Sequence, residues 1–224
     1  MKLSVVISNY NYGQFLGEAI QSALDYSGAG EVIVIDDGST DESLEIAAQF
    51  GSQIRVISKE NGGQGSVFNL GYQEAKGEWI YFLDADDRVL PNFNREVPKC
   101  LSIGNVSKIH FRLKIFGNRS GIEPRQLYRL PSGNCSQEIL RGRHIVVPTS
   151  GNVYARRFLE QILPMPGESF RICADSFLNM HAPFHGEIIA IDHLLAGYRI
   201  HGDNNYANSG ISEKRFAFRY ILTN

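Results

Sequence analysis

The sequence has 224 residues with 22 basic and 24 acidic side chains, so its formal net charge is −2. This near balance, without a run of basic residues, gives no electrostatic support for nucleic-acid binding. The length suits one sizeable domain, and no stretch approaches the roughly 20 apolar residues that cross a bilayer. Three widely spaced cysteines argue against a disulfide framework or a metal cluster. We therefore expect a cytoplasmic protein in a reducing compartment.

The first half of the chain alternates short β-branched runs with segments of helical periodicity. This alternation predicts a parallel sheet with right-handed crossovers. Ser39 and Glu42 form the pattern of a capping box, which predicts the start of the second helix. Strands are expected over residues 3–7, 32–35, 54–57 and 79–83, and helices over residues 15–24, 44–50 and 67–75.

The periodicity weakens after Pro91. We expect this second half to cover the open edge of the first half. The aromatic segment 216–222 is either the start of a longer helix or a surface that docks on a membrane or a partner domain. The expected elements are helices over 97–101, 156–162 and from 174, strands over 108–115, 187–191 and 194–200, an irregular segment over 117–133 and a loop over 163–167.

Polar residues follow three of the predicted parallel strands. Ser8 to Tyr10 follow the first strand, Asp36 and Asp37 the second, and Asp84 to Asp87 the fourth. Ligands of open α/β sheets bind at the carboxyl ends of the strands. The sequence therefore predicts a binding site where these ends meet.

Three carboxylates, those of Asp84, Asp86 and Asp87, end the apolar run that begins at Trp79. Carboxylates crowded at one strand end repel one another unless a cation joins them, and hard divalent cations prefer oxygen ligands. The alternative is a solvated acidic turn before Pro91, and an isolated Asp-x-Asp pattern favours that alternative. The convergence with the other strand ends favours the metal site.

Several motifs resemble those of family 2 glycosyltransferases with the GT-A fold. Their order and spacing fit over most of residues 3–205. Each motif is weak alone, and together they are specific. They are residues 4–11, 34–41, 61–63 with Asn69, 82–87, the base motif Ala174-Asp175, and the C-terminal motif 198–204.

The resemblance implies an α/β fold of GT-A type, with a mostly parallel twisted sheet flanked by helices. It implies one domain over 1–224, with a nucleotide-sugar-binding half over 1–100 and an acceptor-side half over 101–224. The implied activity is inverting, Mn²⁺- or Mg²⁺-dependent transfer of a hexosyl or N-acetylhexosaminyl group from a nucleotide-diphosphate sugar, with UDP preferred. The implied acceptor is a hydroxyl of a saccharide or lipid-linked molecule in cell-surface polysaccharide, glycolipid or wall-polymer synthesis, at the inner face of the cell membrane.

The resemblance also assigns residues to the diphosphate end of the donor. Asp86 is the implied metal ligand, and Asp84 lies nearer the ribose and the metal-bound waters. His201 is implied to reach the metal or the diphosphate, since a neutral imidazole ligates metals and a protonated one pairs with phosphate. Arg199 either neutralises phosphate charge or pairs with an acidic side chain.

The nucleoside end of the donor has its own implied residues. Asp36 is assigned to the base, where a carboxylate can accept an imide N–H group. Ser8 and Tyr10 line the same pocket, and the Tyr10 ring is available to the face of the base. Asn61 completes the implied donor-binding set.

Some neighbouring polar residues and glycines have structural alternatives. Asp37 and Ser39 are expected to shape the turn and to cap the helix. Asp87 either orients the metal-binding groups without touching the metal or stabilises the acidic turn. Gly62 and Gly63 either let the backbone approach the donor or form a plain turn.

Asp175 is the candidate catalytic base for the acceptor hydroxyl, because a carboxylate opposite the diphosphate can take its proton. The family often has Glu-Asp at this motif, and here Ala174 replaces the first acid. The structural alternative is an acidic residue that complements a helix dipole.

Competing functions remain open at this point. A nucleotidyltransferase usually has a basic glycine-rich loop, but residues 8–13 contain no lysine or arginine. A dinucleotide-binding oxidoreductase needs a Gly-x-Gly-x-x-Gly motif after the first strand, and this chain has none. Ala174 gives some support to a nucleotide-sugar-binding module without turnover.

Overall fold

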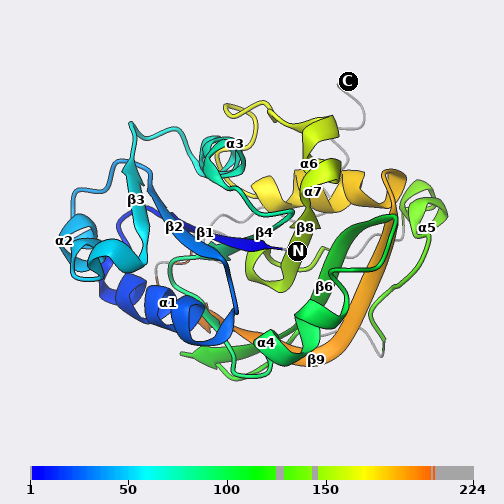
Figure 1. The fold of residues 1–224 in the computed structure, drawn as a ribbon, viewed down its shortest axis with the longest axis horizontal. Helices are drawn as coiled ribbons and strands as arrows, with labels where there is room; N and C mark the ends of the chain where they lie inside the picture. The colour runs from blue at the N-terminus through cyan, green and yellow to red at the C-terminus, as the bar shows by residue number, and fades with distance from the viewer. Residues whose placement is uncertain (1, 125–128, 143–145, 203, 205–224) are drawn as a thin grey trace.

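The computed structural model describes residues 2–124, 129–142, 146–202 and 204. A nine-stranded sheet in the order β3-β2-β1-β4-β8-β6-β9-β5, with β7 paired to β6, runs through the centre (Figure 1). Helices α1 and α2 lie on one side of the first strands, and α3 lies on the other side. The predicted α/β class of GT-A type is confirmed.

The first half contains the predicted alternation of strands and helices, and all its strand pairs are parallel. Val6, Ile33 and Phe82 are fully buried in the three central strands of this half. Burial on both faces is typical of parallel strands and explains their continuous apolar runs. The elements are β1 (Leu3–Asn9), α1 (Gly13–Tyr26), β2 (Glu31–Asp36), α2 (Ser43–Ala48), β3 (Arg55–Ser58), α3 (Gln64–Glu74) and β4 (Trp79–Asp84).

The strand register brings the polar strand ends together at one edge. Ser8 of β1 lies opposite Asp84 of β4, and Asn9 of β1 lies opposite Asp36 of β2. The predicted convergence of strand ends at one edge is therefore confirmed.

The second half continues the same sheet with mixed pairing. Strand β8 lies between β4 and β6 and is antiparallel to both, so it joins the two halves. The elements are β5 (Arg88–Val89), α4 (Phe93–Glu96), β6 (Val106–Gly117), β7 (Gly121–Glu123), α5 (Ser136–Leu140), β8 (Asn152–Ala155), α6 (Arg156–Ile162), α7 (Ala174–His181) and β9 (Glu187–Ile200), with four short 3-10 turns at 51–53, 97–99, 149–151 and 182–184.

Several predicted boundaries differ from the structure. The two strands expected over 187–200 form one continuous strand, β9, which pairs with β6 over its length with register shifts. The helix expected from residue 67 begins at Gln64, so the end of the glycine-rich stretch is helical. Of the helix expected over 97–101, residues 97–99 form a 3-10 turn that directly follows α4. Strand β8 and helix α5 were not expected.

The predicted capping box of Ser39 and Glu42 is wrong. Helix α2 begins at Ser43, and its N-cap residue, Glu42, makes no side-chain cap bond. The Ser39 hydroxyl instead accepts the backbone N–H of Asn11 at 2.9 Å. The Ser39 backbone N–H donates to Asp36 at 3.0 Å, so a turn with Asp36 and a long-range hydrogen bond with Asn11 hold Ser39 in place of the helix cap.

No helix in the described ranges is long and apolar enough to span a bilayer. The segment 216–222, expected to extend a helix or to dock elsewhere, lies outside the described residues.

Candidate active site

The acidic turn after β4 holds its three carboxylates in different surroundings. The backbone N–H of Asp87 donates to the carbonyl of Asp84 at 3.0 Å, which closes the turn. The N–H of Ala85 donates to the carbonyl of Ser8 at 3.0 Å, which fixes the turn against β1. The turn is therefore built into the sheet edge and is not a solvated loop.

Asp86 points toward the segment that follows β9. Its Oδ2 atom lies 2.9 Å from Nε2 of His201 and 3.2 Å from Nδ2 of Asn204. The His201 ring packs against Tyr12 and Phe15, with ring centroids 5.5 and 4.8 Å apart. The structure thus brings together the two predicted metal ligands, which are 115 positions apart in the sequence.

The donor set of Asp86 and His201 fits a divalent cation that is shared with a substrate. Cis ligands with metal bonds of about 2.1 Å lie about 3.0 Å apart, close to the observed O···N separation of 2.9 Å. Within the described ranges no group of three or more His, Cys, Asp or Glu side chains is placed to hold a metal ion. Any cation here would therefore need further ligands, which diphosphate oxygens and waters can supply.

Asp84 is buried beside other acidic side chains. Burial, followed by the charges of the nearby Asp86 and Asp175 carboxylates, raises the pKa of its carboxyl group to about 8. Side-chain hydrogen bonds from Thr149 and Gln64 oppose this rise, and Nε2 of Gln64 lies 3.3 Å from Oδ1 of Asp84. A cation placed among these carboxylates would lower that pKa and relieve their repulsion.

Asp87 connects the ends of β4 and β9. It is 1% exposed, and its Oδ1 atom accepts the backbone N–H of Arg199 at 2.7 Å. Burial, followed by the charges of Asp86 and Asp84, raises the pKa of Asp87 well above its ordinary value. Its contacts favour a structural role, the second of the two alternatives from the sequence.

Arg199 lies beside the acidic turn, but other groups already occupy its guanidinium. Nε donates to the backbone carbonyl of Asp86 at 2.8 Å, and an ion pair joins the group to Glu18. The guanidinium carbon also lies over the rings of Phe15 and Phe116, 4.6 and 4.4 Å from their centroids. The pairing with an acid is thus observed, and the phosphate role stays a prediction.

The acids after β2 are held by hydrogen-bond donors. Asp36 is 1% exposed and accepts hydrogen bonds from the Asn9 side chain at 2.8 Å and the Ser39 N–H at 3.0 Å. The assignment of Asp36 to the base stays a prediction.

Asp37 anchors the glycine-rich loop. It accepts the backbone N–H groups of Gly62 and Gly63 at 2.9 and 2.7 Å, and it pairs with Lys59 at 2.6 Å. A Cβ atom added at Gly63 would lie 2.5 Å from the Cα atom of Arg171. Glycine at position 63 therefore lets this loop pack closely against the segment that leads to Asp175, the candidate catalytic base. The sequence did not indicate this contact.

The remaining predicted donor residues lie near the same edge. Ser8 is partly buried, Tyr10 is 44% exposed, and Asn61 is exposed. The Asn61 amide donates to the backbone carbonyl of Asp37 at 3.1 Å and accepts from Arg171. Their contacts with a nucleoside stay predictions.

Asp175, the candidate base, lies in the first turn of α7. Its charge contributes to the raised pKa of Asp84, so the two carboxylates share one electrostatic environment. Asp175 also accepts the backbone N–H of Ser176 at 2.9 Å. Gln64 hydrogen-bonds both Asp84 and the first residue of α7, so the candidate base lies near the acidic turn, and its role in catalysis stays a prediction.

Four residues at the site had no predicted role. Gln64 contacts Asp84, Asn204 contacts Asp86, and Ser150 accepts the backbone N–H of Asp84 at 3.1 Å. Thr149 accepts a hydrogen bond from Gln64 at 3.1 Å. Asn204 stood inside a recognised motif, whereas the other three had no pattern that pointed to the site.

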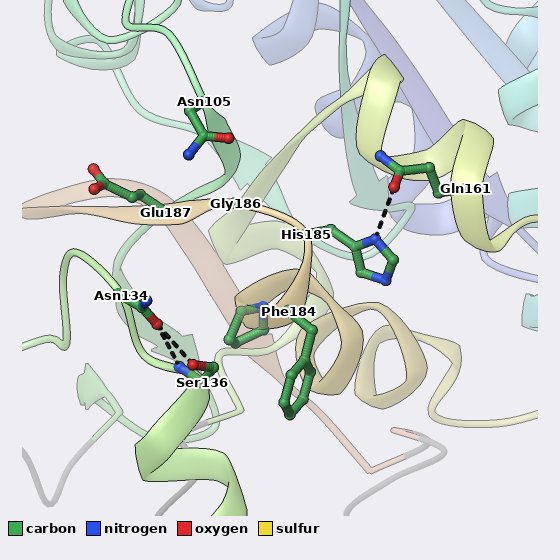
Figure 2. A pocket seen from close by; sticks show the side chains of 9 residues that line it. Asn105, Asn134, Ser136, Gln161, Phe184, His185, Gly186 and Glu187 are labelled. Carbon is green, nitrogen blue, oxygen red and sulfur yellow. Dashed lines mark hydrogen bonds between the residues drawn. The ribbon is translucent and has the colours of Figure 1, made fainter.

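A separate hollow of about 470 Å³ lies at the beginnings of β6 and β9 (Figure 2). His185 points toward Gln161 there, with Nδ1 3.0 Å from the amide oxygen. Strand β6 runs in the same direction as β4, because β8 is antiparallel to both. The hollow therefore lies at the sheet edge opposite the acidic turn, and it is not part of this site.

Comparisons with solved structures support the fold. Staphylococcus aureus TarS 1-349 in complex with UDP-GlcNAc superposes with a TM-score of 0.76 at 19% identity, over 99% of this chain and 65% of that chain. The mannosyltransferase PcManGT from Pyrobaculum calidifontis, in complex with GDP-Man and Mn²⁺, superposes with a TM-score of 0.64 at 15% identity. The match covers 92% of this chain and 59% of that chain. The chain thus spans less than two thirds of the length of each of those structures.

Sequence comparisons give the family. The family model described as glycosyl transferase family 2 matches residues 4–163. A glycosyltransferase of Nostoc sp. PCC 7120 is 36% identical over 96% of this chain and 70% of its own length. Glycosyltransferase GlyG of Streptococcus pneumoniae is 42% identical over 40% of this chain and 32% of its own length. The chain belongs to glycosyl transferase family 2.

Proposed function

We propose that this family 2 glycosyltransferase moves a sugar from a nucleotide-diphosphate sugar to an acceptor hydroxyl with inversion at the anomeric carbon. The observation that carries the proposal is the contact of Asp86 with His201 beside Asp84, together with the hydrogen bonds of Gln64 that join Asp84 to the start of the helix carrying Asp175. We prefer a UDP-sugar that donates a hexosyl or N-acetylhexosaminyl group. TarS, bound to UDP-GlcNAc, has a similar fold and supports this preference by analogy.

The diphosphate end of the donor would lie at the acidic turn. Asp86 and His201 would hold Mn²⁺ or Mg²⁺, and the metal would neutralise the charge of the departing diphosphate. Asp84 would face the ribose and the metal-bound waters. The 2.9 Å separation of the two ligating atoms supports this arrangement.

The nucleoside would lie over the ends of β1 and β2. Ser8, Tyr10 and Asn61 would line this part of the pocket, with Asp36 directed to the base. The exposed Tyr10 ring is available for contact with the face of the base. Arg199 would act at the phosphates only if the donor displaced its pairing with Glu18.

Asp175 would take the proton of the acceptor hydroxyl. A carboxylate within the field of Asp84, but carried by a different element, fits a single displacement in which base and leaving group work from different sides. The acceptor would be a saccharide or lipid-linked molecule of a cell-surface polymer, reached at the inner face of the membrane. The halves 1–100 and 101–224 would divide donor and acceptor binding within one domain.

Nucleotide release from a panel of UDP-, GDP- and dTDP-sugars would test this proposal. We expect release in the presence of Mn²⁺ with one donor class, and a loss of release when EDTA is added. The Asp86→Ala variant should bind no nucleotide in a metal-dependent manner. Metal-dependent binding without release, with every acceptor class offered, would instead support a binding module without turnover. Absence of both would contradict the proposal.

A further inference from the structure

Gln64 is the first residue of α3, and its side-chain amide contacts three separate parts of the site. Nε2 donates to Oδ1 of Asp84 at 3.3 Å and to the hydroxyl of Thr149 at 3.1 Å. Oε1 accepts the backbone N–H of Ala174 at 2.9 Å. Both amide protons and the amide oxygen are thus engaged with groups that surround the reaction site.

The backbone around Gln64 is fixed to the same segment. The N–H of Gln64 donates to the carbonyl of Arg171 at 2.9 Å, and the N–H of Gly65 donates to the carbonyl of Phe170 at 2.8 Å. A Cβ atom at Gly65 would lie 2.9 Å from that carbonyl oxygen. The first turn of α3 is therefore docked closely on the chain that leads into α7.

Helix α7 lacks a cap from its own N-cap residue. Cys173 occupies this position with φ of 61°, a left-handed conformation that is uncommon for a non-glycine residue, and it makes no side-chain cap bond. The first N–H groups of a helix need acceptors from elsewhere. Gln64, 110 residues away in the sequence, supplies one for Ala174.

We propose that Gln64 is a positioning residue that sets the placement of Asp175 relative to Asp84. One amide holds the donor-side carboxylate through nitrogen and the start of the base-bearing helix through oxygen. This inference rests on the proposed function, since it assigns Asp175 as the base. Gln64 itself touches neither donor nor acceptor in this scheme.

The Gln64→Met variant tests this inference, because methionine keeps the length of the side chain and removes all three hydrogen bonds. Gln73→Met is the matched control, since Gln73 lies exposed on the same helix. We expect kcat of Gln64→Met to fall roughly 10- to 100-fold, while the Kd for UDP with Mn²⁺ changes by less than about twofold. The control should match the wild type in both measurements. An unchanged kcat for Gln64→Met would overturn the inference.

A double-variant cycle separates positioning from a general loss of structure. If Gln64 acts through Asp175, adding Gln64→Met to Asp175→Asn should lower the residual rate no further. Fully additive losses would contradict the inference. Should Gln64→Met be too unstable to assay, Gln64→Asn keeps the amide but is one methylene too short, and the same expectations apply.

Hydrogen exchange gives a readout that does not depend on turnover. Gln64→Met should speed amide exchange at Ala174 and in the first turn of α7, and leave β4 protected. If the wild type transferred no sugar, the proposed function would fail, while faster exchange would still support the cap. Unchanged exchange at α7 would overturn the inference even in an active enzyme.

Discussion

Two acidic strand ends lie at one edge of the sheet, on either side of β1, and their carboxylates have different hydrogen-bond and charge partners. After β2, Asp36 and Asp37 accept hydrogen bonds from neighbouring side chains and from backbone N–H groups of nearby loops. After β4, Asp86 contacts His201 and Asn204, whereas Asp84 is buried near the charges of Asp86 and Asp175, and its pKa is raised to about 8.

The two strand ends differ in how fully hydrogen-bond donors and cations within the protein compensate their carboxylates. Buried carboxylates that accept N–H groups and pair with a cation, as Asp37 does with Lys59, are already compensated. Carboxylates that repel one another reduce stability, and a bound cation would relieve that repulsion. Substitutions at the two strand ends should therefore affect different measurements.

The largest effect is expected at Asp175, which shares the field of the β4 acids. Asp175→Asn should lower the transfer rate by about 10²- to 10⁴-fold, because a carboxamide cannot take the acceptor's proton. Calorimetry should show unchanged binding of UDP with Mn²⁺. Transfer at the wild-type rate would exclude Asp175 as the base.

Asp86 tests the metal-binding side of the comparison. Asp86→Ala should weaken Mn²⁺-dependent nucleotide binding by about 100-fold or more, because it removes one of two protein ligands. The His201→Ala variant should show a loss of the same kind. Titration curves of His201→Ala that match the wild type would remove His201 from the donor site.

Asp37 tests the structural side. Asp37→Ala should reduce the free energy of unfolding by about 2–4 kcal/mol, because it removes the ion pair with Lys59 and leaves two backbone N–H groups without their acceptor. Urea denaturation measures this loss. The affinity of the folded variant for Mn²⁺ should remain that of the wild type. Lost metal binding with unchanged stability would reverse the roles of the two strand ends.

Lys108 of β6 is a buried basic side chain, and the smallest effect on stability is expected there. Burial lowers the pKa of its ammonium from 10.5 to about 7, and its hydrogen-bond partner is the Asn179 amide. Between these values the unfolded chain binds the proton more readily, so stability rises with pH. Wild type should gain up to about 1.4 kcal/mol per pH unit relative to Lys108→Met between pH 8 and 10. Parallel stability curves for the two proteins would contradict this expectation.

The sequence predicted the parallel strands because their signals are local. Continuous apolar runs ending in acids identify buried strands and the edge where they meet. The short strand β8 was missed, because its residues 152–155 are strand-forming only through their pairing with β4 and β6. The capping box at Ser39 failed because Asp36 and Asn11 hold this residue elsewhere.

The predicted site residues divide in the same way. Asp86 and His201 were found because each stands in a recognisable motif, and the structure places them in contact. Gln64 carried no such pattern, because its contacts with Asp84 and Ala174 exist only after the chain has folded. Sequence motifs therefore identify ligand-facing groups better than the groups that hold them in place.

The contact between Asp86 and His201 also has a consequence for the order of folding. The two residues are separated by 115 positions, and β9 must pair with β6 before His201 can reach the acidic turn. Contacts of such separation close late, since loop closure must be completed first. During synthesis from the N-terminus, the strands β1 to β4 can assemble while the acidic turn still lacks its imidazole. The proposed metal binding should therefore be among the last properties that a newly made chain acquires.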